Sequence, residues 1–267
     1  MKAASSPCLT SSHPSTQDYQ LALRQAFVHY GLPQRIGLDH DSVFYDNASA
    51  SPFPTVLHLW LIALGVEVRF IEQTPPGEHG VIERGHQTVS QQAIAGQHFS
   101  DGAALRASLA ARLDLLNTRY PSRSLAGQAP LAAHPEAAHS GRPYRLEWEE
   151  HLLDMQRVHD YLAQRRWFRR SGSLGQLSIG GYRYGVGKAF ANQTLEVTFN
   201  SQTLEWICLP ADRREAICIP TRGPTKSALM GELSPLMACP TYQLALPFSP
   251  SAWREMTLAN NPTGTTL

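Results

Sequence analysis

Apolar residues repeat at helical spacing through the first part of the chain, with short alternating segments between the repeats. This spacing predicts helices over 15–30, 57–64, 81–97 and 103–117, and strands over 35–38 and 66–70. Ser15 with Asp18 is expected to form a capping box at the start of the first helix, and Gly31 is expected to end it. A helix–strand–helix–strand–helix–helix order is typical of an α/β layer with at least some parallel strands.

The apolar spacing changes to two in the second part of the chain. Short strands are predicted over 174–179, 182–186, 194–199, 204–209 and 215–219, with turns at Gly180-Gly181 and Asn200-Ser201. Short strands joined by tight turns favour a small, partly open β-barrel. Proline and glycine between 121 and 143 mark a linker, and residues 146–166 are expected to form a helix that ends in a basic run.

The composition excludes several classes of protein. Hydrophobic residues make up 42% of the chain and charged residues 17%, so the chain can bury a core and global disorder is excluded. No apolar run reaches the roughly 18 residues of a membrane span, and the start lacks the apolar segment of a secretory signal. Cys8, Cys208, Cys218 and Cys239 contain no CxxC pair, which argues against structural zinc. We therefore expect a cytoplasmic protein without a membrane partner, nucleoid-associated if it is prokaryotic.

Arginine supplies most of the positive charge, although the formal net charge is only +1. Of the 23 basic residues three are lysines, and the densest group of arginines surrounds two aromatic residues. This run reads Arg165-Arg166-Trp167-Phe168-Arg169-Arg170. It favours contact with phosphates, because the planar guanidinium group matches two oxygens at once. The same run also fits the solvated end of a helix, where cations interact favourably with the helix dipole.

Two acidic residues occupy positions suited to metal binding. Asp39 directly follows a predicted strand, and Glu83 lies in the first turn of a predicted helix. Such positions can bring two carboxylates to one edge of a sheet, where they would bind Mg²⁺ or Mn²⁺ and support phosphoryl transfer. Acids there also favour turns and helix dipoles without any metal. His79, Glu83 and His86 leave a zinc site open as a rival hypothesis, although such a set needs a further ligand.

The order of these motifs resembles the integrase catalytic core, the family of the DDE transposases and retroviral-type integrases. The resemblance covers residues 15–130 and begins with Gly31-Leu32-Pro33, a strand and Asp39. It continues through Leu64-Gly65-Val66, Pro75-Pro76 and Gly80 to Glu83-Arg84, and closes with Asn117, Arg119, Tyr120, Pro121, Ser122, Leu125, Ala126, Gly127 and Pro130. The strands after the linker resemble the small SH3-like β-barrel that follows the core in many of these transposases.

The resemblance implies a fold, a reaction and a set of site residues. It implies part of an RNase H-like core in which Asp39 and Glu83 are the second and third acidic ligands of Mg²⁺ or Mn²⁺, with no small-molecule cofactor. The implied activity of the complete enzyme is DNA integration and transposition by metal-dependent phosphoryl transfer. Transposon ends and target DNA are the implied partners, with self-association on DNA. The expected DNA contacts are Arg84, Arg165, Arg166, Arg169, Arg170 and Lys188.

The chain is expected to divide into parts along these lines. They are a disordered start at 1–14, a partial integrase catalytic core at 15–130, a linker with a basic helix at 131–171, a small β-barrel at 172–222 and an irregular tail at 223–267. The family's first catalytic Asp has no counterpart, because Asp18 is the sole acid before Asp39 and belongs to a helix. We therefore expect an N-terminally truncated enzyme that does not cut DNA alone. The alternative is a catalytically dead DNA- or partner-binding remnant of a transposable element.

Overall fold

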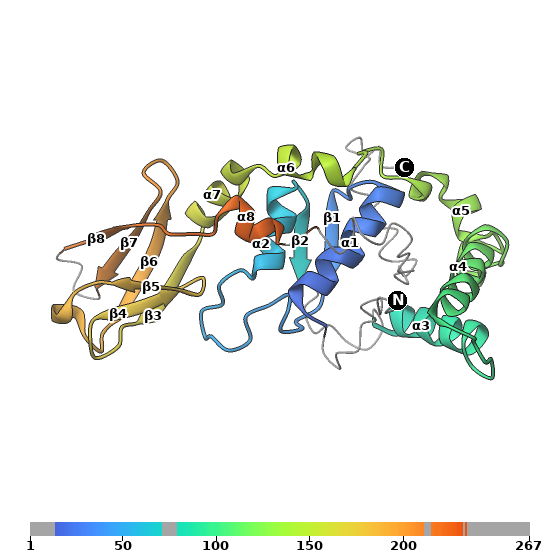
Figure 1. Cartoon of the computed structure of the whole chain (residues 1–267), viewed down its shortest axis with the longest axis horizontal. Coiled ribbons are helices and arrows are strands. Elements are labelled where there is room, and N and C mark those ends of the chain that lie inside the picture. The colour runs from blue at the N-terminus through green and yellow to red at the C-terminus, as the bar shows by residue number, and fades with distance from the viewer. Residues whose placement is uncertain (1–13, 71–78, 211–214, 232, 234–267) are drawn as a thin grey trace, which may run out of the picture. The chain divides into compact units, whose positions relative to one another are not determined.

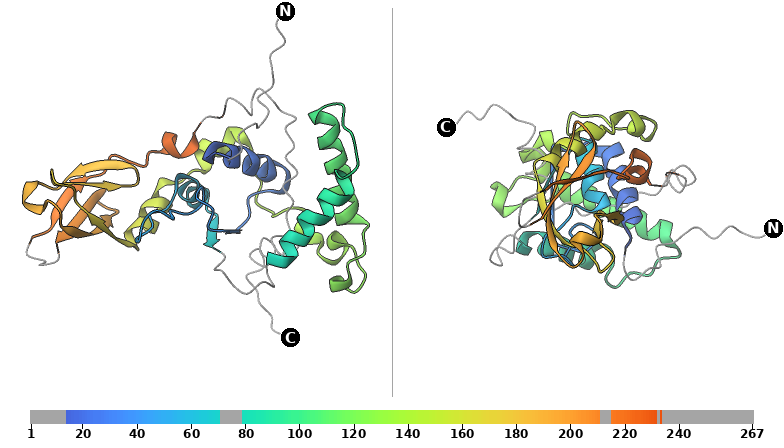
Figure 2. Two further views of the ribbon diagram at one scale, coloured as in Figure 1. Left: turned by 90° about the horizontal axis from the view of Figure 1, so that it is seen from below. Right: turned by 90° about the vertical axis from the view of Figure 1, so that its left-hand side faces the viewer.

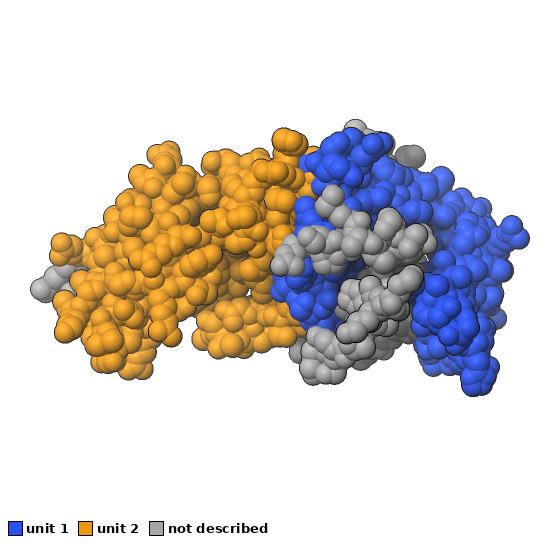
Figure 3. All heavy atoms as spheres, in the orientation of Figure 1, with its two compact units in different colours: residues 1–38, 69–148, 233–267 blue, residues 39–68, 149–232 orange. Residues whose placement is uncertain are grey.

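Two compact units make up the chain in the computed structural model, which describes residues 14–70, 79–210, 215–231 and 233. Unit 1 comprises residues 1–38, 69–148 and 233–267, and unit 2 comprises residues 39–68 and 149–232 (Figure 3). Each unit is therefore assembled from segments far apart in the sequence, whereas the predicted parts are contiguous. The expected disordered start, apart from residue 14, and most of the expected tail lie outside the described residues.

The described part of unit 1 consists mainly of helices. They are α1 (Thr16–Tyr30), α3 (His79–Ala93), α4 (Gly102–Thr118) and α5 (Pro130–Ala133), with short 3₁₀ turns at Arg123–Leu125, Pro135–Ala138 and Leu146–Trp148 (Figure 1). A two-stranded sheet pairs β1 (Arg35–Leu38) with β2 (Glu67–Phe70). Helices α3 and α4 lie side by side (Figure 2). No helix among the described residues is both long and apolar enough to cross a membrane.

Helix α1 shows how local sequence encodes this part of the fold. Ser15 Oγ accepts a hydrogen bond from the Asp18 N–H at 3.3 Å, and Asp18 Oδ2 accepts one from the Ser15 N–H at 2.7 Å. The predicted capping box is therefore confirmed. Leu23 and Phe27 are buried on the apolar face of the helix, and the Phe27 ring meets the Tyr144 ring edge-on at 5.8 Å between centroids. The predicted apolar face of this helix thus forms part of the core of unit 1.

Unit 2 combines helices with antiparallel strands. Its helices are α2 (Val56–Ala63), α6 (Glu149–Leu152), α7 (Met155–Ala163) and α8 (Lys226–Met230), with a 3₁₀ turn at Lys188–Phe190. Its strands are β3 (Arg166–Arg170), β4 (Gln176–Ile179), β5 (Tyr182–Gly185), β6 (Thr194–Asn200), β7 (Glu205–Pro210) and β8 (Ile217–Pro220). A four-stranded sheet has the order β3-β6-β7-β8, and β4 pairs with β5 in a hairpin.

The predicted short strands are present and pair in antiparallel fashion, but the described strands do not close into a barrel. The strands from β4 to β8 lie within a few residues of their predicted places. Among the described residues they belong to separate sheets, because β4 and β5 pair with each other while β6, β7 and β8 pair in series. The described fold is therefore a mixture of helices with a four-stranded antiparallel sheet and a separate hairpin.

The predicted helix over 146–166 is largely helical up to Ala163, but it is interrupted at 153–154 and its basic end is a strand. Asp154 begins a new helix, α7, by accepting a hydrogen bond from the Gln156 N–H at 2.9 Å. The helix ends at Ala163, and the basic run continues as strand β3. The arginines lie on a strand because Trp167 alternates into the core of unit 2, where it is 3% exposed. The expected irregular tail also contains a short helix, α8.

The core of unit 2 joins its two sequence segments. Trp167 and Trp206 are 3% and 1% exposed, and the Phe53 ring lies 4.9 and 6.0 Å from their rings between centroids. Burial of each such side chain contributes on the order of 2 kcal/mol. Trp60 in α2 is 0% exposed, and its Nε1 donates to Glu149 Oε1 at 2.9 Å. Residues 39–68 are therefore packed and hydrogen-bonded into the sheet-bearing unit.

Candidate nucleic-acid interface

Strand β3 divides the predicted arginine cluster between its two faces, because successive side chains of a strand point to opposite sides. Arg166, Phe168 and Arg170 are exposed on one face, where the Phe168 side chain is 53% exposed. Trp167 is buried on the other face. We call the set Arg166, Phe168 and Arg170 the outer face of β3. An aromatic ring between two guanidinium groups can contact both the bases and the phosphates of a nucleic acid.

The neighbouring strand β6 adds hydroxyl groups and a carboxylate to this surface. The residues opposite Arg166, Phe168 and Arg170 are Thr198, Glu196 and Thr194. Arg166 Nη1 lies 3.6 Å from Glu196 Oε1, and the arginine side chain is 70% exposed. An exposed ion pair contributes about 0–1 kcal/mol. The pair therefore does not prevent the guanidinium group from binding a phosphate.

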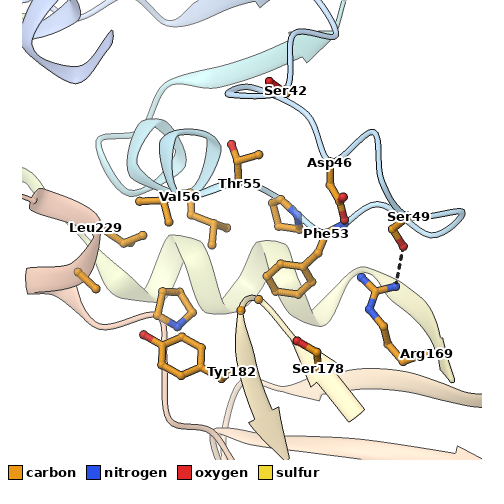
Figure 4. Close-up of a pocket in the computed structure, with 16 residues that line it drawn as sticks. Ser42, Asp46, Ser49, Phe53, Thr55, Val56, Arg169, Ser178, Tyr182 and Leu229 are labelled. Atoms are coloured by element: carbon orange, nitrogen blue, oxygen red, sulfur yellow. Dashed lines mark hydrogen bonds between the residues drawn. The ribbon is translucent and has the colours of Figure 1, made fainter. Parts of the chain in front are cut away.

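Arg169 projects from the inner face of β3 and is held by the loop formed by residues 39–55. Its Nη1 donates to the Ser51 carbonyl oxygen at 2.6 Å and to Ser49 Oγ at 3.4 Å, the bond drawn in Figure 4. The side chain is half-buried, and burial lowers the pKa of the guanidinium group while Asp46 raises it. Contact between Arg169 and DNA stays a prediction.

A pocket of about 660 Å³ lies beside this anchoring site (Figure 4). Its lining includes the apolar residues Phe53, Leu59 and Leu229 and the polar residues Ser42, Asp46, Ser49, Thr55, Arg169, Ser178 and Tyr182. Asp46 Oδ2 accepts a hydrogen bond from the Phe53 N–H at 3.2 Å, so this carboxylate shapes the loop at the pocket wall. The pocket was not predicted, because its residues come from segments that are distant in the sequence.

Arg165 lies between α7 and β3, beside an aromatic pair. Its guanidinium carbon is 4.8 Å from the centre of the Tyr161 ring, and that ring meets the His58 ring edge-on at 5.3 Å. An exposed cation–π contact of this kind contributes about 0.5–1 kcal/mol. Burial, followed by the positive charge of Arg165, lowers the pKa of His58 from 6.5 to about 4. His58 is therefore neutral at neutral pH.

Acid is expected to destabilise unit 2 through His58. Because its pKa is 6.5 when unfolded and about 4 when folded, the neutral side chain stabilises the fold above pH 6.5. This contribution is lost as the pH falls to about 4, and the expected loss is about 3 kcal/mol. The measurement is urea unfolding at successive pH values for wild type, His58→Phe and the exposed control His98→Gln. His58→Phe should flatten the profile; equal acid sensitivity in all three proteins would contradict this assignment.

The two remaining predicted DNA contacts, Lys188 and Arg84, do not belong to β3. Lys188 is exposed at the start of the 3₁₀ turn between β5 and β6, in unit 2. Arg84 belongs to α3 in unit 1, and its side chain lies outside the described residues. Both contacts stay predictions.

The two predicted metal ligands belong to different units. Asp39 of unit 2 is exposed, and its Oδ1 accepts a hydrogen bond from the Asp41 N–H at 3.1 Å. Glu83 lies in α3 of unit 1, and its side chain and those of His79 and His86 fall outside the described part. Within the part of the chain that is described, no three His, Cys, Asp or Glu side chains form a group that could hold a metal ion. The described residues thus contribute one carboxylate, and the Mg²⁺, Mn²⁺ and zinc hypotheses stay predictions.

Sequence reasoning missed the anchors of the loop. Ser49, Ser51 and Pro52 were not among the predicted site residues, yet each accepts a hydrogen bond from β3. The adjacent aromatic residues Trp167 and Phe168 fit neither a helical nor a strand period well, and no signal in the sequence identifies this loop as the partner of β3. A scan of the whole chain against models of protein families finds no match.

Proposed function

We propose that this chain is a DNA-binding fragment of a DDE transposase or retroviral-type integrase. The observation that carries the proposal is the outer face of β3, where Arg166 and Arg170 flank an exposed Phe168. Arginine binds phosphate oxygens in pairs and aromatic rings stack on bases, so this face offers both contacts to a nucleic acid. Phosphate contacts position DNA without reading its sequence, so target recognition would be largely independent of sequence.

The charge of the surrounding sequence supports the same partner. From Arg165 to Lys226 the sequence contains ten basic and four acidic residues, although the whole chain has a net charge of only +1. A local excess of positive charge attracts a polyanion even when the total is near zero. Each phosphate that is neutralised would release counterions, so binding should weaken with salt.

The order of elements supports the family part of the proposal. It runs α1-β1-α2-β2-α3-α4, as the integrase-like motifs predict. We propose that these elements belong to a partial RNase H-like core and that the strands of unit 2 correspond to an SH3-like barrel. In the complete enzyme Asp39 and Glu83 would hold Mg²⁺ or Mn²⁺, which supplies Lewis-acid chemistry for phosphoryl transfer. Since the described residues contribute only Asp39 to such a site, no catalytic step is assigned to this chain.

A DNA- or partner-binding remnant without catalysis is the second candidate function. Asp18, the acid that precedes Asp39, is committed to the cap of α1. Its Oδ2 accepts hydrogen bonds from both the Ser15 N–H and the Ser15 hydroxyl at 2.7 Å. This use argues against Asp18 as a third metal-binding carboxylate. Mn²⁺-dependent nicking of DNA by the chain, abolished by Glu83→Gln, would exclude the remnant.

The double variant Arg166→Ala/Arg170→Ala tests DNA binding. Loss of two phosphate contacts is expected to weaken the affinity for a DNA duplex by about 10- to 100-fold at 0.1 M salt. Arg157→Ala is the matched control, because Arg157 lies on α7 with its Nε 3.5 Å from Asp154 Oδ2. Fluorescence anisotropy with labelled DNA measures all three proteins. An unchanged Kd for the double variant would overturn the proposed interface.

A further inference from the structure

The loop of residues 39–55 in unit 2 has its own internal hydrogen bonds. It starts at Asp39, the proposed metal ligand, and leads to Thr55, the N-cap of α2. Asn47 Nδ2 donates to the His40 carbonyl oxygen at 2.6 Å, and Thr55 Oγ1 donates to the Phe44 carbonyl oxygen at 3.2 Å. These bonds tie the two ends of the loop to its interior.

Three consecutive residues of β3 hold the middle of this loop. Trp167 Nε1 donates to the Pro52 carbonyl oxygen at 2.9 Å, and the Phe168 N–H donates to Ser51 Oγ at 3.0 Å. Arg169 Nη1 donates to the Ser51 carbonyl oxygen at 2.6 Å. Because β3 is one of the two edge strands of the described sheet, these bonds also cover part of an edge that could otherwise pair with another strand.

The bond made by Arg169 is of a stronger kind than the other two. A hydrogen bond from a charged donor is shorter and roughly twice as strong as one between neutral groups. The same Nη1 also donates to Ser49 Oγ at 3.4 Å and to the Phe168 carbonyl oxygen at 2.9 Å. The guanidinium group therefore spans the strand and the loop. Arg166 and Arg170 project from the opposite face of the same strand.

We propose that Arg169 is a positioning residue, which holds the loop that begins at Asp39 against the sheet, and that Arg166 and Arg170 make the DNA contacts of β3. This assignment rests on the proposed function, in which the loop carries a metal ligand and the outer face of β3 binds DNA. Because successive side chains of the strand point to opposite faces, the adjacent residues Arg169 and Arg170 have different roles.

Arg169→Gln and Arg170→Gln are matched variants, because they remove the same group from adjacent residues on opposite faces of β3. Hydrogen–deuterium exchange of the full chain is followed by mass spectrometry in peptides within 42–55, with peptides of β6 and β7 as the internal reference. Arg169→Gln is expected to speed exchange in the loop on the order of tenfold and to leave the reference peptides unchanged. Arg170→Gln is expected to leave both unchanged.

DNA affinity is the second readout, which a purely structural role does not change. Arg170→Gln should weaken duplex binding by up to about tenfold at 0.1 M salt, and Arg169→Gln should leave the Kd close to that of wild type. If Arg169→Gln weakens DNA binding as much as Arg170→Gln does and leaves loop exchange unchanged, Arg169 is a phosphate contact. The positioning role is then overturned and the proposed function stands. If Arg169→Gln loosens the loop while Arg166→Gln and Arg170→Gln leave binding unchanged, the positioning role stands and the proposed function fails.

Trp167→Phe keeps the proposal testable if Arg169→Gln does not fold. Phenylalanine keeps an aromatic ring in the core and removes the donor to the Pro52 carbonyl oxygen. Exchange in 42–55 should rise in this variant, with β6 and β7 protected as in wild type. Unchanged loop exchange, or faster exchange throughout β6 and β7, would overturn an anchoring role for β3.

Discussion

Replacing Gly175 with alanine is expected to destabilise unit 2 by at least about 4 kcal/mol. Gly175 has φ of +65°, and an added Cβ would lie 2.9 Å from the Lys188 nitrogen and closer still to the Gly187 carbonyl group. These are backbone atoms, which cannot rotate away as a side chain can. The Gly175 carbonyl oxygen also accepts a hydrogen bond from the Val186 N–H at 2.8 Å, so any shift weakens the end of the β4–β5 hairpin.

Gly181→Ala is the matched control for this prediction. Gly181 also has positive φ, at +83°, but an added Cβ would meet nothing within 4 Å. Holding alanine at this positive φ should lower the free energy of unfolding by only about 1 kcal/mol. Urea unfolding followed by tryptophan fluorescence gives the free energy of unfolding for both variants. Equal losses would show that the close approach at Gly175 is not a feature of the folded protein.

Trp60→Phe is expected to lower the free energy of unfolding by about 3 kcal/mol, and Trp206→Phe by about 1 kcal/mol. Both side chains are buried, at 0% and 1% exposure. Trp60 Nε1 donates to the buried Glu149 carboxyl group at 2.9 Å, whereas Trp206 Nε1 has no hydrogen-bond partner among the described residues. The first variant therefore removes a bond to a buried acceptor, and the second removes a donor that has no bond.

The two variants control for each other, because each replaces a buried indole by the same smaller ring. Denaturant unfolding monitored by circular dichroism provides the comparison. A larger loss in Trp206→Phe than in Trp60→Phe would mean that packing around the rings outweighs the bond to Glu149.

Local sequence signals were sufficient to predict most of the longer helices and the strands from β4 to β8. The bond pair between Ser15 and Asp18 involves residues three positions apart, so the sequence alone identifies it. The strands from β4 to β8 follow from alternating apolar positions and from turns such as Gly180-Gly181. The same spacing rules did not predict that Arg24 of α1 is buried, because they rank residues by polarity and do not include tertiary partners.

Strand β3 could not be told from a helix end by its own residues. Val158 and Leu162 continue a helical spacing up to the arginine run, and two adjacent aromatic residues in that run fit neither period well. The choice depends on Trp167, which enters the core beside Phe53 at 4.9 Å between ring centroids. That contact joins segments more than a hundred positions apart, so periodicity within a short window cannot detect it.

The sequence predicted which arginines belong to the candidate site, but it did not predict that they have different roles. The sequence shows four clustered arginines, and only the register of β3 separates Arg169 from Arg166 and Arg170. The carbonyl oxygens that Arg169 contacts belong to the backbone of the loop, and a backbone acceptor leaves no signal in residue type. For Asp39 and Glu83 the sequence remains the basis of the prediction.

The most direct test of the proposed function is the salt dependence of DNA binding by the full chain. The Kd for a DNA duplex is measured between about 50 and about 200 mM salt for wild type and for Arg166→Ala/Arg170→Ala. The logarithm of the binding constant should fall linearly with the logarithm of the salt concentration, and the double variant should reduce the steepness of that line by about 2. Binding that does not respond to salt, or equal steepness in the two proteins, would contradict a phosphate-binding role for β3.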